Sequence, residues 1–407
     1  MTKLILLTVS FPYGRGEQFL ENEIKYLAET FDKIIIIPAI IDKNLRPLPD
    51  NVRIDTGFAE NHNLLNILWS AFKSIDTYEE LVRHPHILTS IWKIQRLLSF
   101  MGRGYAQYLY LKKYYFFDSK TLYYSYWFNG SCYALYLLKK EKPIKYILRA
   151  HGSDLYLEAN KGYLPLRKQV VHQANTIFCI SQNGADYMKN TYALNLSTPI
   201  KVARLGTHNC NTVNKTISPT NHQFHLVSCA HITYNKRIDL LISAIKILGN
   251  KNPSCQIYWT HIGSGPQFEE IKILSQSLPN NIHITLLGHM NNKDIIEYYS
   301  KNNLELFVNT SKSEGLPVTF MEAMSCGIPV MAPSIGGIPE IVNNKNGILL
   351  SKNINASIVY KELQKALIDK ESLFYKGIEA RKTWEKEYNA EKNYKKFAKQ
   401  LKAIISE

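Results

Sequence analysis

Short, continuously apolar runs alternate along this chain with longer amphipathic stretches such as 18–31 and 237–248. The apolar runs are strand candidates at 4–10, 34–40, 122–126, 146–150, 176–181, 200–205, 224–230, 256–262, 282–287, 304–310, 328–332 and 347–350. A strand exposed on one face alternates apolar and polar residues, whereas a parallel strand covered by helices on both faces is apolar throughout. The pattern therefore predicts an α/β fold with doubly wound parallel sheets.

The length of 407 residues exceeds what one hydrophobic core usually supports, so we expect two domains. The stretch 208–223 is polar and lacks an apolar period, and it separates two series of β-α units. We interpret it as an interdomain linker, with the boundary near residue 210.

The net charge, the cysteine spacing and the apolar runs reduce the number of functional classes to which the protein could belong. The net charge of +15 favours an anionic partner, but the chain has no RNP motif, zinc-finger spacing or basic repeat, so we expect no nucleic-acid partner. Six scattered cysteines without a C-x-x-C pair predict buried thiols rather than a disulfide framework or a zinc site. The start, MTKLILLTVS, is typical of a first core strand rather than a signal peptide, and we expect no membrane span.

The segment SEGLPVTFMEAMSCGIPV (313–330) contains two carboxylates eight positions apart, Glu314 and Glu322. Pro317 and Gly327 predict the start and end of a helix between them. The amides around Gly315, Leu316 and Val318 would then be unpaired at a helix N-terminus, which attracts anions and hydroxyl oxygens. Such a site suits a nucleotide sugar. The alternative is a buried glutamate that caps a nearby loop.

This segment resembles the E-x7-E signature of retaining glycosyltransferases of family 4. The resemblance implies the GT-B fold, in which two Rossmann-like domains face each other across a cleft and close on the donor. Residues 1–207 would bind the acceptor and residues 208–385 the nucleotide sugar. The C-terminal helix at about 386–407 would pack back on the first domain.

Further motifs of the second half resemble the same family. In SCAHITYNKRIDLLISAI (228–245), Lys236 falls at the phosphate-binding lysine, and His231 stands where the family has arginine. Arg237 is the alternative source of the missing cation. Gly263 belongs to a G-x-G turn that permits close backbone approach. The segment that contacts the base in relatives contains Gly288, His289 and Met290.

The first half has two comparable motifs. FPYGRGEQFLENEI (11–24) resembles the family's first loop, where Gly14 and Gly16 would present amides to the donor. Phe19 replaces the third glycine of a dinucleotide-binding motif, which disfavours a nicotinamide dehydrogenase. RAHGSDLY (149–156) contains His151 at the position of the family histidine that approaches the donor sugar, and Asp154 would orient the loop or the acceptor.

The resemblance assigns roles by position. The catalytic residues would be His151, Glu314 and Lys236, with Glu314 on sugar hydroxyls and Glu322 on the ribose. The donor would be a UDP-linked nucleoside-diphosphate sugar, bound at Gly315, Leu316, Pro317 and Val318. No Asp-x-Asp triplet occurs in the chain, so we expect neither a metal nor another cofactor. Transfer would retain the anomeric configuration.

The stretch 91–117 combines five lysines and arginines with many aromatic residues and no acid until Asp118. This pattern suits docking on the anionic inner face of the cytoplasmic membrane. The alternative is a helix with a solvated basic face and a buried aromatic face. The predicted acceptor is a saccharide or a polyprenyl-diphosphate-linked saccharide.

The sequence therefore predicts a cytoplasmic enzyme of bacterial surface polysaccharide synthesis, whether lipopolysaccharide O-antigen, capsule or exopolysaccharide. The competing hypotheses are a non-catalytic GT-B partner subunit and a GT-B sugar-nucleotide epimerase or phosphorylase. Nothing in the sequence resembles the pyridoxal-phosphate site of a phosphorylase.

Overall fold

The structure is a computed structural model that describes residues 1–14, 16–192, 197–210 and 222–406. The chain forms two compact units. The first consists of Met1–Leu205 together with Glu391–Glu407, and the second of Gly206–Ala390. Most of the predicted linker at 208–223 lies outside the described residues.

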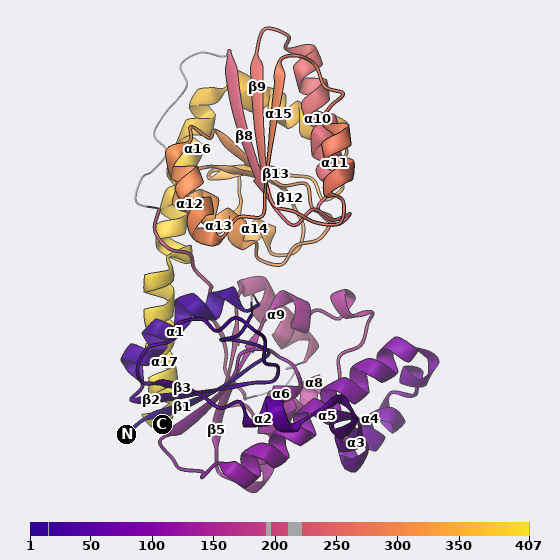
Figure 1. Cartoon of the computed structure of the whole chain (residues 1–407), viewed down its shortest axis with the longest axis vertical. Coiled ribbons are helices and arrows are strands. Elements are labelled where there is room, and N and C mark those ends of the chain that lie inside the picture. Colours follow the sequence, from indigo (N-terminus) through magenta and orange to yellow (C-terminus); the bar gives the residue numbers. More distant parts are fainter. Residues whose placement is uncertain (15, 193–196, 211–221, 407) are drawn as a thin grey trace. The chain divides into compact units, whose positions relative to one another are not determined.

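The first unit contains a seven-stranded, fully parallel sheet with the order β3-β2-β1-β4-β5-β6-β7 (Figure 1). Its strands are β1 (Lys3–Thr8), β2 (Lys33–Pro38), β3 (Val52–Ile54), β4 (Thr121–Ser125), β5 (Lys145–Ala150), β6 (Thr176–Cys179) and β7 (Ile200–Val202). All but β3 were predicted. That edge strand has only three residues and an exposed arginine at its centre, so no apolar run marks it.

Helices cover both faces of this sheet, which is why its strands are apolar throughout. They are α1 (Gln18–Thr30), α2 (Gly57–Asn61), α3 (Leu64–Lys73), α4 (Ile75–Arg83), η1 (Pro85–Thr89), α5 (Ile91–Tyr114), α6 (Gly130–Glu141), α7 (Gly152–Leu155), η2 (Glu158–Asn160), α8 (Arg167–Gln173), α9 (Gln182–Thr191) and α17 (Ala390–Ser406). Within β1, Leu4 and Leu6 pack in one cluster with α1 and α17. Ile5 and Leu7 pack in the other with α5 and α6.

The second unit repeats the design with a six-stranded parallel sheet in the order β10-β9-β8-β11-β12-β13. Its strands are β8 (Gln223–Cys229), β9 (Gln256–Ile262), β10 (Ile282–Gly288), β11 (Leu306–Val308), β12 (Val330–Pro333) and β13 (Gly347–Leu350), all of them predicted. Its helices are α10 (Ile238–Lys251), α11 (Phe268–Leu274), α12 (Asn292–Lys301), α13 (Val318–Ser325), α14 (Ile338–Ile341), α15 (Ala356–Ile368), α16 (Lys370–Thr383) and the π-helical turn η3 (Trp384–Tyr388).

Helix α5 buries most of the aromatic residues on which the docking prediction for 91–117 depended, whereas Tyr114 and Phe116 are 59% and 85% exposed. Phe100, Tyr108 and Tyr110 are buried in the core of the first unit. Trp92 and Tyr105 pack against the same cluster, half-buried. The alternative of a buried aromatic face is confirmed, because this long helix packs along α3 and α6.

The cysteine prediction holds for four residues and is wrong for two. Cys132, Cys179, Cys229 and Cys255 are free and buried. Cys210 and Cys326 form a disulfide. They are separated by 116 residues in the sequence, so their spacing gave no sign of the pairing. No helix of the described chain combines the length and the apolar character needed to cross a membrane.

A fully buried ion pair joins the first helix to the sheet of the first unit. Arg149 on β5 contacts Glu23 on α1, and neither side chain is exposed to solvent. Arg149 also donates to the carbonyl of Ala203 at 3.0 Å, and Tyr124 donates to Glu23 at 3.1 Å. The guanidinium lies 4.7 Å from the centroid of the Phe397 ring on α17. One arginine thereby connects β5, α1 and the C-terminal helix.

Glu23→Leu is expected to destabilise the protein by about 3–5 kcal/mol, because it leaves the Arg149 charge buried without its counterion. The midpoint of urea unfolding, followed by circular dichroism, measures the change. Glu21→Leu on the same helix is the control: its side chain is half-exposed, and the substitution should cost about 1 kcal/mol or less. Equal midpoints for the two variants would contradict the role of the buried pair.

Candidate functional site

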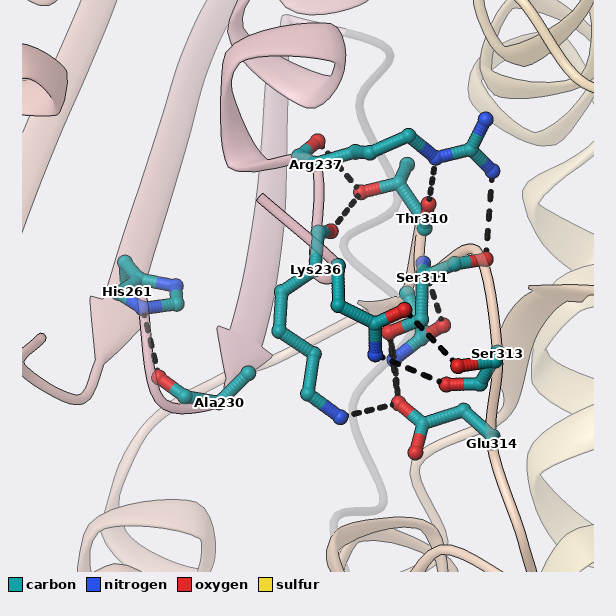
Figure 2. A network of polar contacts seen from close by, with 10 residues as sticks. Ala230, Lys236, Arg237, His261, Thr310, Ser311, Ser313 and Glu314 are labelled. Atoms are coloured by element: carbon teal, nitrogen blue, oxygen red, sulfur yellow. Dashed lines mark hydrogen bonds and ion pairs between the residues drawn. The ribbon is translucent and has the colours of Figure 1, made fainter. Parts of the chain in front are cut away.

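Two loops meet at the carboxyl edge of the second sheet, where parallel α/β sheets generally bind ligands. One follows β8 and the other follows β11, and these strands are neighbours. Thr310 donates its hydroxyl to the carbonyls of Lys236 and Arg237 at 3.0 and 2.9 Å. The amide of Lys312 donates to the carbonyl of Asn235 at 2.7 Å. These bonds fix the two loops to each other (Figure 2).

The joined loops place a cation against a carboxylate. Lys236 Nζ lies 2.6 Å from Oε1 of Glu314, and the two side chains are 22% and 12% exposed (Figure 2). Oε1 also accepts from the Ser311 hydroxyl at 2.6 Å and from the Asn309 amide at 3.4 Å. Among the described residues, the other oxygen of Glu314 has no partner. The pair is thus rigidly held and keeps one acceptor open.

Helix α13 begins immediately after this carboxylate. The helix starts at Val318, one residue later than predicted, so Pro317 is its N-cap, and Gly327 follows its end in the left-handed conformation, with φ of 76°. The amides of Gly315, Leu316 and Val318 make no hydrogen bond to any residue that the structure describes. The predicted donor end of the helix is therefore present beside Glu314.

Glu322 lies one turn into α13 and is 4% exposed. Burial raises the pKa of its carboxyl to about 8. Its carboxyl makes no hydrogen bond to any part of the described chain, so the alternative of a loop-capping glutamate receives no support. A buried carboxyl without a partner is costly and is typical of a binding site.

The loop after β12 packs against the backbone of the loop that contains Glu314. The amide of Gly337 donates to the carbonyl of Gly315 at 3.0 Å. A side chain at Gly336 would bring its Cβ within 1.8 Å of the carbonyl oxygen of Glu314. Two glycines are thus needed here because the backbones touch.

A buried histidine supports the loop after β8. His261 at the end of β9 contacts the carbonyl of Ala230 through Nε2 at 3.2 Å and the Ser228 hydroxyl through Nδ1 at 2.8 Å (Figure 2). Burial lowers the pKa of His261 to about 4, so the ring is neutral at physiological pH. Next to it, the amide of Gly263 donates to the carbonyl of Gly288 at 2.7 Å. The sequence did not identify His261 as part of this edge.

The remaining cations and the predicted base-contacting residues differ in their surroundings. Arg237 was one of two candidates, with His231, for the missing phosphate-binding cation, and its guanidinium donates to the carbonyls of Thr310, Ser311 and Ile354. It points away from Glu314 in Figure 2. His231 and His289 are exposed and Met290 half-buried. No hydrogen bond within the described chain joins these three to the Lys236–Glu314 pair.

In the first unit, the glycine loop before α1 is held from within the fold. Gly14 has φ of 65°, and its amide donates to the carbonyl of Asn44 at 2.8 Å. This contradicts the expectation that Gly14 presents its amide. Arg46 donates to the carbonyls of both Gly14 and Gly16. Arginine thereby fixes the loop geometry from a position that the sequence did not mark.

His151 follows β5, and its loop is closed by Asp154. The Asp154 carboxylate accepts from the amides of His151 and Phe128 at 2.7 and 2.8 Å. Nε2 of His151 contacts the carbonyl of Tyr126 at 3.0 Å. Burial, together with the charge of Arg149, lowers the pKa of His151 to about 3. The ring is therefore neutral, and Nε2 carries its proton because a carbonyl only accepts.

Trp127 connects His151 to the glycine loop. Its ring lies 4.4 Å from the His151 ring, and its Nε1 donates to Glu17 at 2.7 Å. Glu17 also accepts from the amides of Val9, Ser10 and Phe11. The structure thus places Gly14, Gly16 and His151 at one edge of this sheet. Trp127 and Glu17 were missed, although Trp127 follows a predicted strand.

The edge of the second unit offers a lysine, free amides, an open carboxylate oxygen and a second, buried carboxyl. Cations and amides bind phosphate, and carboxyl oxygens accept from sugar hydroxyls. Within the described residues, no group of three or more His, Cys, Asp or Glu side chains is placed to hold a metal ion.

Comparison with known proteins places this architecture in context. Residues 214–387 match the family model described as "Glycosyl transferases group 1". An uncharacterised glycosyltransferase of Methanocaldococcus jannaschii is 31% identical over 262 residues, which cover 63% of this chain and 68% of that protein. The O-antigen biosynthesis glycosyltransferase WbnH of Escherichia coli is 33% identical over 159 residues, 39% of this chain and 42% of WbnH.

A solved structure shares the fold over both units. The lipopolysaccharide outer core galactosyltransferase WaaB, in its apo form, has a TM-score of 0.68 at 15% identity, over 98% of this chain and 100% of that chain. At this identity the likeness shows the fold alone.

Glu322→Gln is expected to change how stability depends on pH. Between the ordinary pKa of 4.5 and the folded value of about 8, the native state holds a proton that the unfolded state has lost. The free energy of unfolding therefore falls as pH rises through this window, by at most about 1.4 kcal/mol per pH unit. The variant lacks this pH dependence. The melting temperature of the variant minus that of the wild type should therefore be larger at pH 8 than at pH 5.

Glu269→Gln, at an exposed carboxyl of the same unit, is the matched control and should follow the wild type at both pH values. A difference between wild type and Glu322→Gln that is the same at pH 5 and pH 8 would show that Glu322 is already ionised in the folded protein.

Proposed function

This chain belongs to the group 1 glycosyltransferases and has the GT-B fold, and we propose that it transfers a sugar from a nucleoside-diphosphate sugar to a saccharide acceptor. The proposed donor is UDP-linked, and the proposed acceptor is a saccharide or a lipid-linked saccharide. The proposed reaction is that of family 4, with retention of the anomeric configuration.

The observation that carries the proposal is the Lys236–Glu314 pair beside the unpaired amides that precede and begin α13. A diphosphate needs a cation and donors, and a sugar needs acceptors for its hydroxyls. Both requirements are met within one short stretch of backbone. The pair is preformed, so donor binding exchanges one partner of Lys236 for another without a large movement of the loops.

We assign the donor groups as follows. Lys236 and the amides of Gly315, Leu316 and Val318 bind the diphosphate and stabilise the negative charge that develops on it as the bond to the sugar breaks. His231 adds a donor, since Arg237 is engaged with backbone carbonyls. When the diphosphate binds Lys236, the ion pair between Lys236 and Glu314 is broken. The Glu314 carboxylate can then accept hydrogen bonds from sugar hydroxyls.

Glu322 is assigned to the ribose. Its carboxyl is protonated over most of the physiological pH range, because burial raises its pKa to about 8. A protonated carboxyl both donates and accepts, whereas a carboxylate only accepts. It can therefore pair with a ribose hydroxyl in either direction without placing a charge inside the domain.

His151 is assigned to the sugar. Because its Nε2 proton is engaged by the Tyr126 carbonyl and its pKa lies near 3, it does not act as a general acid at neutral pH. It contributes a neutral polar edge, held in place by the Trp127 ring and by the loop that Asp154 closes.

Bacterial surface polysaccharide synthesis is the proposed setting. The match to WbnH, an O-antigen enzyme, supports it over the part of the chain that the two share. Lipopolysaccharide O-antigen, capsule and exopolysaccharide assembly all use acceptors of the proposed class.

Glu314→Gln is expected to lower kcat/KM for transfer by about 100-fold or more, because the charge that orients the sugar and holds Lys236 is lost. Release of nucleoside diphosphate from a panel of UDP-, GDP- and ADP-sugars measures the rate. Nuclear magnetic resonance of the product reports its anomeric configuration.

Glu297→Gln is the matched control, since it breaks another lysine–glutamate pair of this unit on the exposed surface of α12. It should keep the wild-type rate. No turnover of any nucleotide sugar by the wild-type protein, or a Glu314→Gln rate equal to wild type, would refute the proposal.

Treatment with EDTA is expected to leave the initial rate unchanged, since Lys236 and the backbone amides supply the positive charge that a metal ion would otherwise supply. Initial rates with EDTA and with added Mg²⁺ or Mn²⁺ test this. A rate that vanishes with EDTA and returns with a divalent ion would show that the diphosphate is bound through a metal.

A further inference from the structure

The lobe formed by α3, α4, η1 and the start of α5 carries an unusual number of exposed apolar side chains. They are Leu64, Leu65, Trp69, Phe72, Ile75, Tyr78, Val82, Leu88 and Ile91, each at least 50% exposed. Single exposed apolar residues are ordinary, but nine within 28 positions of one lobe indicate an interaction surface. In Figure 1, α3 and α4 lie beside α5, on the side of the first unit away from α1.

Helix α4 has its polarity reversed. Ile75, Tyr78 and Val82 lie at i, i+3 and i+7, which places them along one stripe of the helix. They are 73%, 51% and 81% exposed. Asp76 and Glu80 are 8% and 1% exposed. A surface helix of a globular protein usually turns its apolar stripe inward, whereas α4 exposes this stripe and only Leu81 of its large apolar residues packs against the core.

Specific contacts fix this orientation. Asp76 accepts from the Tyr133 hydroxyl at 2.7 Å. Glu80 accepts from the Tyr163 hydroxyl and from the amide of Leu166, both at 3.3 Å. Rotating α4 to bury its apolar stripe would break these hydrogen bonds and leave Asp76 and Glu80 without their donors. The exposed stripe is therefore built into the fold.

Helix α3 contributes a second stripe. Leu65, Trp69 and Phe72 lie at i, i+4 and i+7 and are 67%, 67% and 50% exposed. Its opposite side contains Ser70 and Ala71, which are buried. Two consecutive helices thus leave most of their large apolar residues in solvent, while Ile67, Leu68 and Leu81 are half-buried.

Charges around the stripes are mainly basic. Lys73 is exposed between the two helices, and Lys93 is half-exposed at the start of α5. Across 61–93, the only exposed acid is Glu79, and Arg83 pairs with it at 2.7 Å. The margin therefore has unpaired positive charge and no unpaired negative charge.

We propose that this lobe docks on an anionic lipid membrane. Leu65, Trp69, Ile75, Tyr78 and Val82 enter the boundary between headgroups and acyl chains, while the lysines contact the headgroups. A fluid bilayer accepts side chains that project from several helices, and its negative surface matches the basic margin. Tryptophan and tyrosine are the aromatic residues favoured at such interfaces.

The proposal deepens the proposed function, because a membrane-bound enzyme meets lipid-linked acceptors at the surface where they lie. Its physical basis is separate: membrane binding depends on the α3–α4 lobe, whereas the residues assigned to the donor diphosphate and ribose belong to the second unit, and His151 lies outside that lobe. Binding and nucleotide-sugar turnover can therefore be measured independently.

Sedimentation with phosphatidylglycerol vesicles tests the proposal. The full-length protein should bind them, and the double variant Ile75→Ser, Val82→Ser should bind at least about tenfold more weakly, since two apolar side chains no longer leave water. The matched control is Ile273→Ser, Ile368→Ser, which changes two isoleucines of the second unit that are 64% and 65% exposed. Melting temperatures and turnover of a nucleotide sugar in solution should be unchanged in both variants.

Weaker binding of the α4 variant alone, together with weaker binding of the wild type to neutral phosphatidylcholine vesicles, would support the proposal. Three results would overturn it: no binding of the wild type, equal binding of both double variants, or equal binding to anionic and neutral vesicles. A wild-type dimer that the α4 variant converts to monomer, without vesicle binding, would identify a second copy of the chain as the partner instead.

Discussion

The second unit depends on one constraint: all strands of a parallel sheet end at the same edge. Because β8 and β11 are neighbours, residues more than 70 positions apart arrive there side by side. Thr310 and Lys312 then bond to the backbone of the β8 loop, so the two loops behave as one rigid piece. The short contact between Lys236 and Glu314 follows from this arrangement. Neither side chain has to be ordered when a ligand arrives.

This edge holds its two carboxyl groups in opposite electrostatic states. Glu314 forms an ion pair with Lys236 and accepts from a serine and an amide, whereas Glu322 has no such partner and burial raises the pKa of its carboxyl to about 8. One helical turn therefore separates a charged acceptor from a neutral donor and acceptor. A ligand with a polar sugar at one end and a nucleoside at the other needs this kind of difference, because a second buried charge would oppose the binding of a diphosphate.

Much of this could be predicted from sequence, because apolar runs in a doubly wound fold are a direct consequence of burial on both faces. Twelve strands followed from them, and β3 did not, because three residues around an exposed arginine leave no such trace. The pairing of Lys236 with Glu314, the disulfide of Cys210 with Cys326 and the contact of Trp127 with His151 could not be predicted. Each depends on which loops the strand order brings together, and the spacing of residues along the chain does not encode that order.

The same limit explains why the amphipathic pattern of 91–117 left two interpretations open. A stripe of aromatic residues identifies the apolar face of a helix but not what covers it. In α5 the rest of the unit covers that face, and Phe100 and Tyr108 are buried. In α4 two acids fix the orientation of the helix. Asp76 and Glu80 accept from tyrosine hydroxyls inside the fold, and these bonds hold the helix with Ile75 and Val82 facing solvent. The orientation of an amphipathic helix is thus set by where its polar residues find partners, and the apolar face that this orientation leaves in water is available to a partner from outside the chain.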